Sequence, residues 1–370
     1  MYRTLRRRMI LRIGVVGSLI VWTLFCGVVF SKYGYEIDEF DARVRALIRT
    51  GKFDTRYFDK DGLPVTVDAR TGRRFISPFY VVHYGLIHSE ALRESGDFKG
   101  IHWEKDSSLE LWGGKPESLS PIAFIKNADW VVRNAKKLNG LDHLVYTFDW
   151  RYPNYPNGGL QAPWWSGLTD AYAILLLMRA YDVSSNEDYL RVARSLYTST
   201  ISPVEVGGSL VEVEGDPWIE EYVDRRAAPE DMSHVLNGMI YAYRGIKAFE
   251  AQAGIVDGYA VRLKKSIQRH IEDFSLGNWS YYDLIGNVAN IKYHRIHVDL
   301  LSDRDFYSES LQPTLSSWQR GLDYPGFYWF MASNWSWARF HFLVFFLACC
   351  FMGCAVILVV SCKARRVGGR

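Results

Sequence analysis

The sequence predicts a mainly α protein: an incomplete, toroid-like (α/α) barrel with β-hairpins at the rim of a cleft, a small N-terminal β segment, and two flanking transmembrane helices. Three observations support this prediction. Apolar residues recur at helical spacing through most of the middle of the chain. The predicted helices come in pairs separated by hairpins and long loops, which favours helix pairs around a shared core. Two long uncharged segments lie near the chain ends.

The two ends of the chain carry the membrane signals. Five arginines precede the uncharged segment 13–30, and one lysine and three arginines follow the uncharged segment 342–362. Positive residues tend to stay in the cytosol, so we expect both termini there and the rest of the chain across the membrane. The first segment is long and has no small-residue cleavage site, which favours an uncleaved anchor over a signal peptide.

Composition narrows the alternatives. The net charge of +3 is small, and we expect no nucleic-acid partner. All five cysteines lie in or next to the predicted spans, so the part between the spans has no disulfide and no thiolate site. The aromatic content of 15% suits a carbohydrate groove and equally an aromatic-rich core.

The predicted segments are a cytosolic tail (1–12), a transmembrane helix (13–30), a stalk with β-hairpins (31–76), an (α/α) domain (77–322), a juxtamembrane aromatic segment (323–341), a second transmembrane helix (342–362) and a second tail (363–370).

The N-terminal part of the predicted extramembrane region favours β structure. Residues 33–51 are charged and lack clear periodicity, so we expect a stalk. Residues 53–75 contain short alternating runs separated by two glycine-containing turns, which predicts β-hairpins. Asp59 and Asp61 in the first turn are candidate ligands of a structural calcium ion, although a solvated turn explains them better.

Helical periodicity then continues almost to the second span. The predicted helices are 80–94, 120–140, 166–181, 186–197, 233–251, 256–274 and 303–321. The helix 166–181 is apolar on most faces and should be buried. The predicted strands are 144–150, a hairpin within 207–222, and 278–284.

Two stretches carry candidate catalytic residues. In the first, Glu220 and Glu221 stand beside Tyr222 in a loop that opens into a helix. The second follows roughly sixty positions later and contains Tyr282 and Tyr293. Carboxylate and phenol groups brought together from separate loops suit proton transfer at carbon. An unperturbed phenol, with a pKa of about 10, is a poor acid or base at pH 7 until its neighbours tune it.

The second stretch also contains two histidines. His294 and His297 are three positions apart, a spacing that permits a metal pair. The sequence offers no third ligand at a clear spacing. Hydrogen bonding or a structural role therefore explains them better than metal catalysis.

Five motifs, in fixed order, resemble the C-terminal domain of the D-glucuronyl C5-epimerases, which turn glucuronate into iduronate within heparan-type chains. The motifs are WWSGLTDAYAILLLMRAY, WIEEY, HVLNGMIYAYRGI, YYDL and KYHRIHVDLL. Upstream, SPFYVVHYGLIHSEAL and FDKDGLPV are similar to that family's preceding segment. The likeness extends over 53–322.

The resemblance implies a membrane-anchored isomerase that inverts C5 of glucuronate in a heparosan- or heparan-type polysaccharide by taking one proton and returning another. It implies catalytic roles for Tyr222, Tyr293, Glu221 and Tyr282. Tyr222 and Tyr293 would face the two sides of C5, Glu221 would assist one of them, and Tyr282 would orient the uronate. No cofactor is implied.

The sugar-binding residues are less clear, because this chain departs from the family pattern. The family has Arg-His after Tyr-Asp-Leu, whereas Ile285-Gly286 follows here, so the basic group that would hold the carboxylate is missing from its usual place. Candidate replacements are Arg151, Arg225, Arg226, Lys292 and Arg295. Further candidate sugar contacts are His294, His297, Asn237 and Trp165.

Partners and compartment follow from the same resemblance. We expect an acidic polysaccharide and a membrane as partners, with a homodimer as a candidate assembly. The domain between the spans would lie in the Golgi lumen, or outside the cytoplasm in a bacterium. Sequons at Asn278 and Asn334 would then be available for glycosylation. Two alternatives remain: a polysaccharide lyase that shares C5 deprotonation, and a non-catalytic glycan-binding protein.

Overall fold

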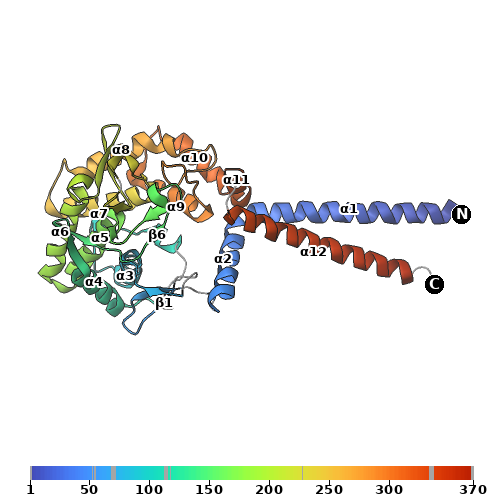
Figure 1. Cartoon of the computed structure of the whole chain (residues 1–370), viewed down its shortest axis with the longest axis horizontal. Coiled ribbons are helices and arrows are strands. Elements are labelled where there is room, and N and C mark those ends of the chain that lie inside the picture. The colour runs from blue at the N-terminus through green and yellow to red at the C-terminus, as the bar shows by residue number, and fades with distance from the viewer. Residues whose placement is uncertain are drawn as a thin grey trace. The chain divides into compact units, whose positions relative to one another are not determined.

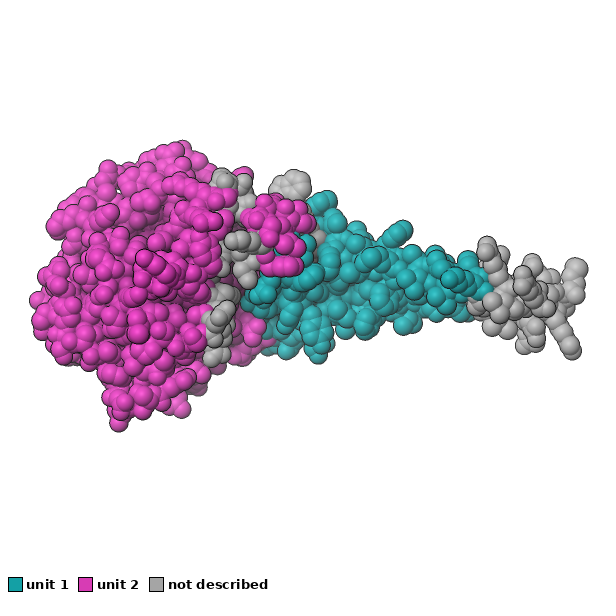
Figure 2. Space-filling model, turned by 90° about the horizontal axis from the view of Figure 1, so that it is seen from below, with its two compact units in different colours: residues 1–45, 320–370 teal, residues 46–319 magenta. Residues whose placement is uncertain are grey.

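The structure, a computed structural model, describes residues 2–51, 53, 56–67, 72–111, 116, 118–226, 228–332 and 337–367. The chain divides into two compact units (Figure 2). The first combines residues 1–45 with 320–370, and the second comprises residues 46–319. The second sequon, at Asn334, lies outside the described residues.

The first unit contains the predicted membrane segments. Helices α1 (Tyr2–Lys32) and α12 (Trp337–Val367) lie side by side (Figure 1), and α11 (Pro325–Ala332) precedes α12. Within them, Ile13–Lys32 and Leu343–Lys363 are long and apolar enough to cross a membrane. The indole Nε1 of Trp22 donates to the carbonyl of Cys349 over 3.4 Å. Both segments overlap the spans predicted from the sequence.

Helix α2 (Gly34–Thr50) occupies the charged stretch that we expected to form a stalk and in which we saw no clear periodicity. Its charges are spaced to support a helix. Arg45 and Asp41, four positions apart, form an ion pair of 2.9 Å. A pattern dominated by charge hid the helical periodicity from an analysis based on apolar residues.

The predicted N-terminal hairpins are present as a three-stranded antiparallel sheet of β1 (Arg56–Phe58), β2 (Pro64–Val67) and β3 (Arg74–Phe75). In the first turn, Asp59 Oδ1 accepts from the amides of Asp61 and Leu63 at 2.8 and 2.9 Å. Asp61 pairs with Lys126 at 2.8 Å. Asp59 therefore shapes the turn and Asp61 binds a lysine outside it. Among the described residues no group of three His, Cys, Asp or Glu side chains is placed to hold a metal ion.

The second unit is mainly helical, as predicted (Figure 1). Its α-helices are α3 (Pro78–Arg93), α4 (Pro121–Asn134), α5 (Gly167–Ser184), α6 (Glu187–Ile201), α7 (Leu236–Ala253), α8 (Tyr259–His270), α9 (Ile291–Leu301) and α10 (Gln312–Gly321). They pack as the pairs α3–α4, α5–α6 and α7–α8. Helix α5 also packs against α3 and α7 and is buried along most of its length, as its apolar sequence predicts.

Short 3-10 helices fill several of the connections. They are η1 (Ile101–Trp103), η2 (Ser107–Leu111), η3 (Pro156–Gly158), η4 (Val204–Val206), η5 (Pro229–Asp231), η6 (Ile271–Phe274) and η7 (Arg304–Phe306). The long helix predicted for 303–321 is therefore shorter: η7 comes first, and α10 begins only at Gln312.

One predicted helix ends early. We expected a helix over 120–140, but α4 stops at Asn134 and a hairpin of β4 (Ala135–Leu138) and β5 (Leu141–Leu144) follows. Asn139 and Gly140 form the turn with positive φ angles of 55° and 89°. An Asn-Gly pair favours this left-handed hairpin turn, and this local signal overrides the helical periodicity around it.

The described residues form three further two-stranded sheets, two between nearby segments and one between distant segments. They are β6 (Trp150–Arg151) with β7 (Gly159–Leu160), β8 (Trp164–Trp165) with β11 (Val223–Asp224), and β9 (Leu210–Val213) with β10 (Asp216–Ile219). The last is the hairpin predicted within 207–222. The strand predicted at 278–284 is absent among the described elements, where only isolated bridges such as Tyr281 to Val288 occur.

Candidate active site

An aromatic cleft lies in the second unit, with a volume of about 180 Å³. Its walls come from the N-terminal sheet, the start of α3, the β5–β6 connection, the start of α5, the loop after β10 and the start of α9. Three predicted catalytic residues, Glu221, Tyr222 and Tyr293, line it. The site therefore combines segments more than 200 residues apart in the sequence, from Thr66 to Tyr293.

Phenols meet at one side of this cleft. The hydroxyl groups of Tyr222 and Tyr282 are hydrogen-bonded at 2.9 Å. The ring of Tyr282 packs against that of Tyr293, with centroids 4.7 Å apart. Burial and the nearby Glu221 charge raise the pKa values of Tyr222 and Tyr282 well above the usual 10. Both phenols are therefore neutral in the resting site and can donate hydrogen bonds.

Local structure explains how each phenol is held. Tyr222 follows β10 and directly precedes β11, whose pairing with β8 fixes the loop. Tyr282 lies in a loop: its carbonyl accepts from the amide of Leu236 at 3.2 Å. Tyr293 lies in the first turn of α9, where the side chain of Asn290 caps the helix by accepting from the Tyr293 amide at 2.9 Å.

Glu221 is the carboxyl group of the cleft. It is only 8% exposed, and its Oε2 has no hydrogen-bond partner among the described residues. Burial, together with the charge of Glu220, raises its pKa to about 8, although nearby phenolic hydroxyls partly oppose this. Gly238 on α7 leaves space for it, because a Cβ there would lie 2.5 Å from Oε2.

Glu220 has different surroundings. It is fully buried and lies outside the lining of the cleft. Its carboxylate accepts from the backbone amide of His234 at 3.1 Å and forms a close ion pair with the His234 imidazole. Burial alone would lower the pKa of His234, but the charge of Glu220 raises it above the usual value. This pair fixes the loop before α7.

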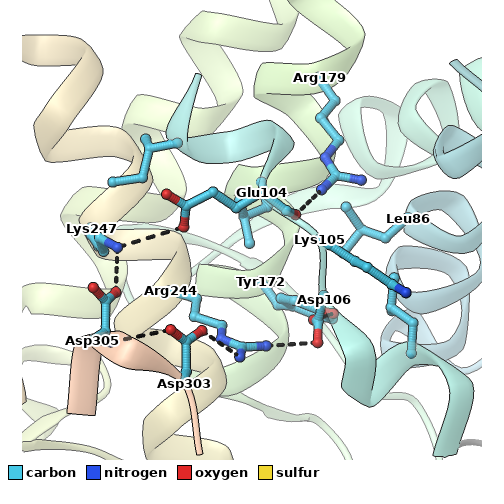
Figure 3. A pocket seen from close by; sticks show the side chains of 13 residues that line it. Leu86, Glu104, Lys105, Asp106, Tyr172, Arg179, Arg244, Lys247, Asp303 and Asp305 are labelled. Atoms are coloured by element: carbon cyan, nitrogen blue, oxygen red, sulfur yellow. Dashed lines mark hydrogen bonds and ion pairs between the residues drawn. The ribbon is translucent and has the colours of Figure 1, made fainter. Parts of the chain in front are cut away.

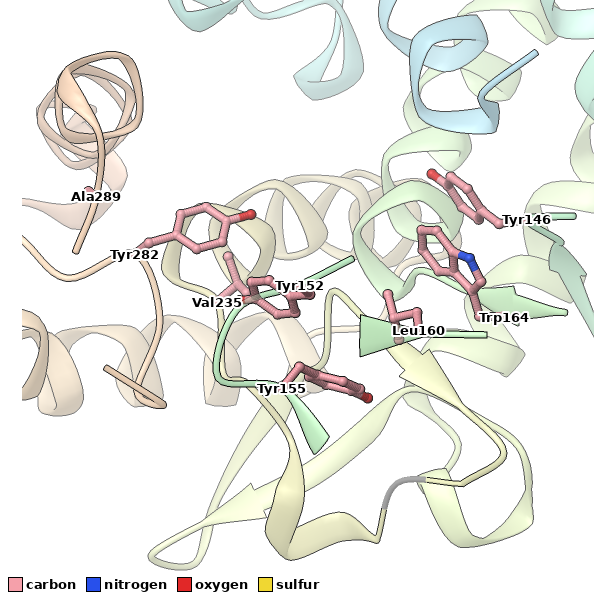
Figure 4. Close-up of a cluster of buried hydrophobic side chains, with 8 residues drawn as sticks. All are labelled: Tyr146, Tyr152, Tyr155, Leu160, Trp164, Val235, Tyr282 and Ala289. Atoms are coloured by element: carbon pink, nitrogen blue, oxygen red, sulfur yellow. The ribbon is translucent and has the colours of Figure 1, made fainter. Parts of the chain in front are cut away.

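A third carboxylate, that of Asp283, holds a tyrosine that packs against the cleft phenols. The hydroxyl of Tyr152 donates to Asp283, and the amide and side chain of Asn287 also donate to that carboxylate, at 2.9 and 2.6 Å. The Tyr152 ring packs edge-on against Tyr222, with centroids 4.9 Å apart. Figure 4 shows Tyr152 between Tyr282 and the cleft-lining Trp164. Neither Tyr152 nor Asp283 was among the predicted site residues.

Sequence reasoning also missed most of the aromatic wall. The additional aromatic lining residues are Phe75, Phe79, Tyr80, Tyr146, Phe148, Trp150 and Trp164. Trp164 stacks on Tyr146, with centroids 3.8 Å apart. The strand-like run LVYTFDW contains three of these residues at alternating positions, Tyr146, Phe148 and Trp150. That alternation was the available signal, since alternate side chains on an extended segment share a face.

The two histidines, which the sequence offered as candidate sugar contacts or as structural residues, do not line the described cleft. His294 and His297 are fully buried, and the Nδ1 atoms of both lie 2.9 Å from the hydroxyl of Ser280. His294 also stacks on Trp279, with centroids 3.8 Å apart. Burial lowers the pKa of His294 to about 3, and that of His297 well below 6.5. Both are neutral core residues.

Other predicted contacts also lie elsewhere. Asn237 is 1% exposed on α7 and does not line the cleft. Trp165 is 2% exposed, and its indole donates to the carbonyl of Gly208 at 3.1 Å, so it is a core residue. Its neighbour Trp164 faces the cleft instead. Adjacent strand residues point to opposite faces, which explains the exchange.

The cationic candidates lie around the cleft rather than in its wall. None of the described lining residues is a lysine, arginine or histidine. Arg151 and Arg225 are exposed outside the lining. Arg226 binds Asp224 at 2.6 Å. On α9, Arg295 is exposed, and Lys292 lies beside the Tyr293 ring with its Nζ 5.9 Å from the centroid.

A second, smaller pocket is a network of ion pairs (Figure 3). Arg244 on α7 pairs with Asp106 at 2.7 Å and with Asp303 at 3.2 Å. Lys247, one turn further, binds Asp305 and lies 3.7 Å from Glu104. The charges face one another and join α7 to the turns around η1 and η7. This pocket therefore has a structural explanation.

Phenols and a buried carboxyl group converge on an aromatic cleft in a mainly helical domain, an arrangement that suits acid–base chemistry. Residues 139–308 match the family model described as D-glucuronyl C5-epimerase C-terminus. This match supports the C5-epimerase family that the motifs predicted.

Two relatives show how far the similarity extends. The chain is 32% identical over 180 residues to an uncharacterized protein of Methanocaldococcus jannaschii, covering 47% of this chain and 56% of that protein. It is 28% identical over 206 residues to the D-glucuronyl C5-epimerase of Caenorhabditis elegans, covering 48% of this chain and 31% of that enzyme. The match thus spans little more than half of the first relative and about a third of the second.

Proposed function

We propose that this protein is a membrane-anchored uronosyl C5-epimerase that inverts C5 of glucuronate residues within a heparosan- or heparan-type polysaccharide. The observation that carries the proposal is the convergence of Tyr222, Tyr282 and Tyr293 beside Glu221, within a domain of the C5-epimerase family. The helix pairs of that domain would form an incomplete (α/α) toroid with the cleft at its rim.

The chemistry needs two groups on opposite faces of one carbon. The proton on C5 is α to a carboxylate and is only weakly acidic, so its removal requires stabilisation of the enediolate that develops. Tyr222 and Tyr293 both line the cleft and would serve the two faces of C5. Tyr282 contacts both, through a hydrogen bond to Tyr222 and ring packing against Tyr293, and would couple them.

The two long apolar helices support membrane anchoring. With arginine-rich flanks in the cytosol, the domain between them would lie in the Golgi lumen, or outside the cytoplasm in a bacterium. An acidic polysaccharide made in such a compartment would reach the cleft without crossing the membrane.

Isotope exchange tests the proposal. The full chain, purified in detergent, is incubated with heparosan in deuterated water. An epimerase incorporates deuterium at C5 and does not cleave the polysaccharide, whereas a lyase cleaves it and produces the ultraviolet absorbance of an unsaturated uronate. Polymer binding with neither signal would identify a non-catalytic glycan-binding protein and contradict the proposal.

A further inference from the structure

Helix α2, which follows the first apolar span, has an apolar face that is largely exposed. Successive helix residues are about 100° apart, so its apolar residues fall within an arc of about 100°, with the charged residues outside it. The apolar residues, here called the α2 stripe, are Ile37, Phe40, Val44, Leu47 and Ile48. Phe40 is 53% exposed and Ile48 is 77% exposed. Such a face in water needs an explanation.

Helix α11, which precedes the second span, also has one buried and one exposed apolar face. Gly326 and Trp329 are buried, whereas Phe327 and Met331 are exposed. The buried face meets the end of α1, because a Cβ on Gly326 would lie 2.1 Å from the carbonyl oxygen of Phe30. Phe30 belongs to the span Ile13–Lys32. The exposed face of α11 therefore begins beside the last turn of the first span.

Ring contacts place α2 at the ends of the two spans. Phe40 comes eight residues after Lys32, where the first span ends, so a helix continuing straight would carry it about 12 Å beyond that span. Instead, the centroid of the Phe40 ring lies 6.3 Å from that of Phe345, the third residue of the span Leu343–Lys363. Phe345 also contacts Phe30 of the first span, with centroids 5.7 Å apart. The α2 stripe is therefore continuous with the apolar surface of the spans.

The charges of α2 indicate which kind of surface it fits. The helix has four acidic residues and three arginines: Glu36, Asp38, Glu39, Asp41, Arg43, Arg45 and Arg49. A helix held by anionic lipids carries an excess of lysine and arginine on its polar face, and α2 has none. Its attraction to a membrane would be apolar, through side chains such as phenylalanine and leucine that enter the boundary between headgroups and acyl chains.

We propose that α2 and α11 lie in the membrane interface, where the chain leaves the first span and where it enters the second. Phe40 and Ile48 of α2, and Phe327 and Met331 of α11, enter the boundary between headgroups and acyl chains. The partner is the bilayer itself, and zwitterionic lipid is sufficient. This inference rests on the membrane anchoring in the proposed function and adds two interfacial helices to the two spans. It also distinguishes α2 from a stalk, which would lead the chain away from the membrane.

Lipid photolabelling of the full chain tests this inference. The photoreactive amino acid benzoylphenylalanine replaces Phe40 or Phe327, which retains an aromatic ring, and the protein is reconstituted into phosphatidylcholine vesicles. The matched control is Ala42, which is exposed on the opposite face of α2. After illumination, mass spectrometry measures the fraction of each peptide that carries a lipid. We expect about tenfold more lipid adduct at Phe40 and at Phe327 than at Ala42.

A position within the first span separates this inference from membrane anchoring itself. Val21 is exposed on α1 and should be labelled if α1 crosses the bilayer. Labelling at Val21 but not at Phe40 or Phe327 would leave the anchoring intact and contradict the inference, whereas no labelling at Val21 would contradict both. Crosslinks from Phe40 to a second protein chain would identify a protein interface and also overturn the inference. Deuterium exchange into heparosan tests the epimerase activity independently of these outcomes.

Lipid composition separates apolar insertion from electrostatic attachment. Labelling at Phe40 should change by less than about twofold when about a third of the phosphatidylcholine is replaced by phosphatidylserine. It should also change by less than about twofold between about 0.1 M and about 1 M salt, because screening affects only the charged contacts. Labelling that required phosphatidylserine would mean that the arginines hold α2, and would contradict apolar insertion. Thermal unfolding of each labelled variant shows whether the fold is retained.

Discussion

Glu220 and Glu221 are adjacent in the chain but face two different regions of the second unit. Glu220 lies in the packed interior, where His234 neutralises it. Glu221 lies at the cleft with Tyr222, and no described cation pairs with it. The same residue type is thus a structural ion pair in one region and a candidate reactive acid in the other. Their partners, rather than their sequence motif, distinguish the two roles.

Helix α9 repeats this division between the cleft and the interior. Tyr293 lines the cleft, whereas the next residue, His294, is fully buried against Trp279. Successive helix residues point about 100° apart, so one motif supplies both surfaces. The contrast predicts that substitutions at cleft positions change turnover, while substitutions at interior positions change stability.

The largest expected effect is on the phenols. Tyr222→Phe or Tyr293→Phe should reduce deuterium exchange by about 100- to 10,000-fold, because each removes a proposed acid–base group. The matched control is Tyr197→Phe, which removes a buried hydroxyl that donates to Glu250 at 2.7 Å and lies outside the described lining of the cleft. The control should lose stability and keep its exchange rate. Equal losses of exchange in all three variants would contradict a special role for the cleft phenols.

Glu220→Gln tests the interior. It leaves His234 without its carboxylate partner, and we expect a loss of about 3 kcal/mol in unfolding free energy. Because the folded-state pKa of His234 is raised, the pair stabilises the unmodified protein fully at low pH, and this contribution disappears as the pH rises past that raised pKa. Thermal unfolding followed from about pH 6 to about pH 9 should show this decline in the unmodified protein and a flatter profile in Glu220→Gln. Identical profiles would show that the pair contributes little.

Two glycines on α7 allow the same substitution to be compared at the cleft and in the interior. Gly238→Ala would place a Cβ 2.5 Å from Glu221 Oε2, so the acid must move. Deuterium exchange should then fall by about 100-fold, because small displacements at a reacting centre are costly. The stability should change little, because the higher helix propensity of alanine, about 1 kcal/mol, offsets the strain. In Gly245→Ala the new Cβ would instead overlap the backbone carbonyl of Ala171 on α5. That variant should lose stability, with little change in exchange per folded molecule.

The sequence predicted several residues that line the candidate site, but not the directions of the side chains beside them. Order and spacing of the motifs led to the C5-epimerase family and to Glu221, Tyr222 and Tyr293, all of which line the cleft. The periodic helices α5 and α6 were likewise predictable. The directions of neighbouring side chains could not be predicted: the candidates Trp165 and His294 are buried outside the described lining, whereas Trp164 lines the cleft.

Most of the remaining misses come from long-range contacts. The aromatic wall joins the N-terminal sheet and the β5–β6 connection to the loop at Tyr222, and such long-range contacts leave no local periodicity. Tyr152 became recognisable only when the fold brought it to Asp283, which is 131 positions away. Strong local signals, such as Asn139-Gly140, also replaced the helix that a wider window predicted.

The smallest expected effect compares two tryptophans. Trp150 lines the cleft and is 46% exposed, so it is available to stack on a sugar ring. Trp150→Ala should raise KM about fivefold, corresponding to about 1 kcal/mol of stacking, with kcat and thermal stability nearly unchanged. Trp165→Ala should do the opposite, because it leaves a cavity beside His143 and removes the hydrogen bond to Gly208. If Trp165→Ala instead raised KM and left the stability unchanged, Trp165 would be part of the wall of the cleft, which would contradict its assignment to the core.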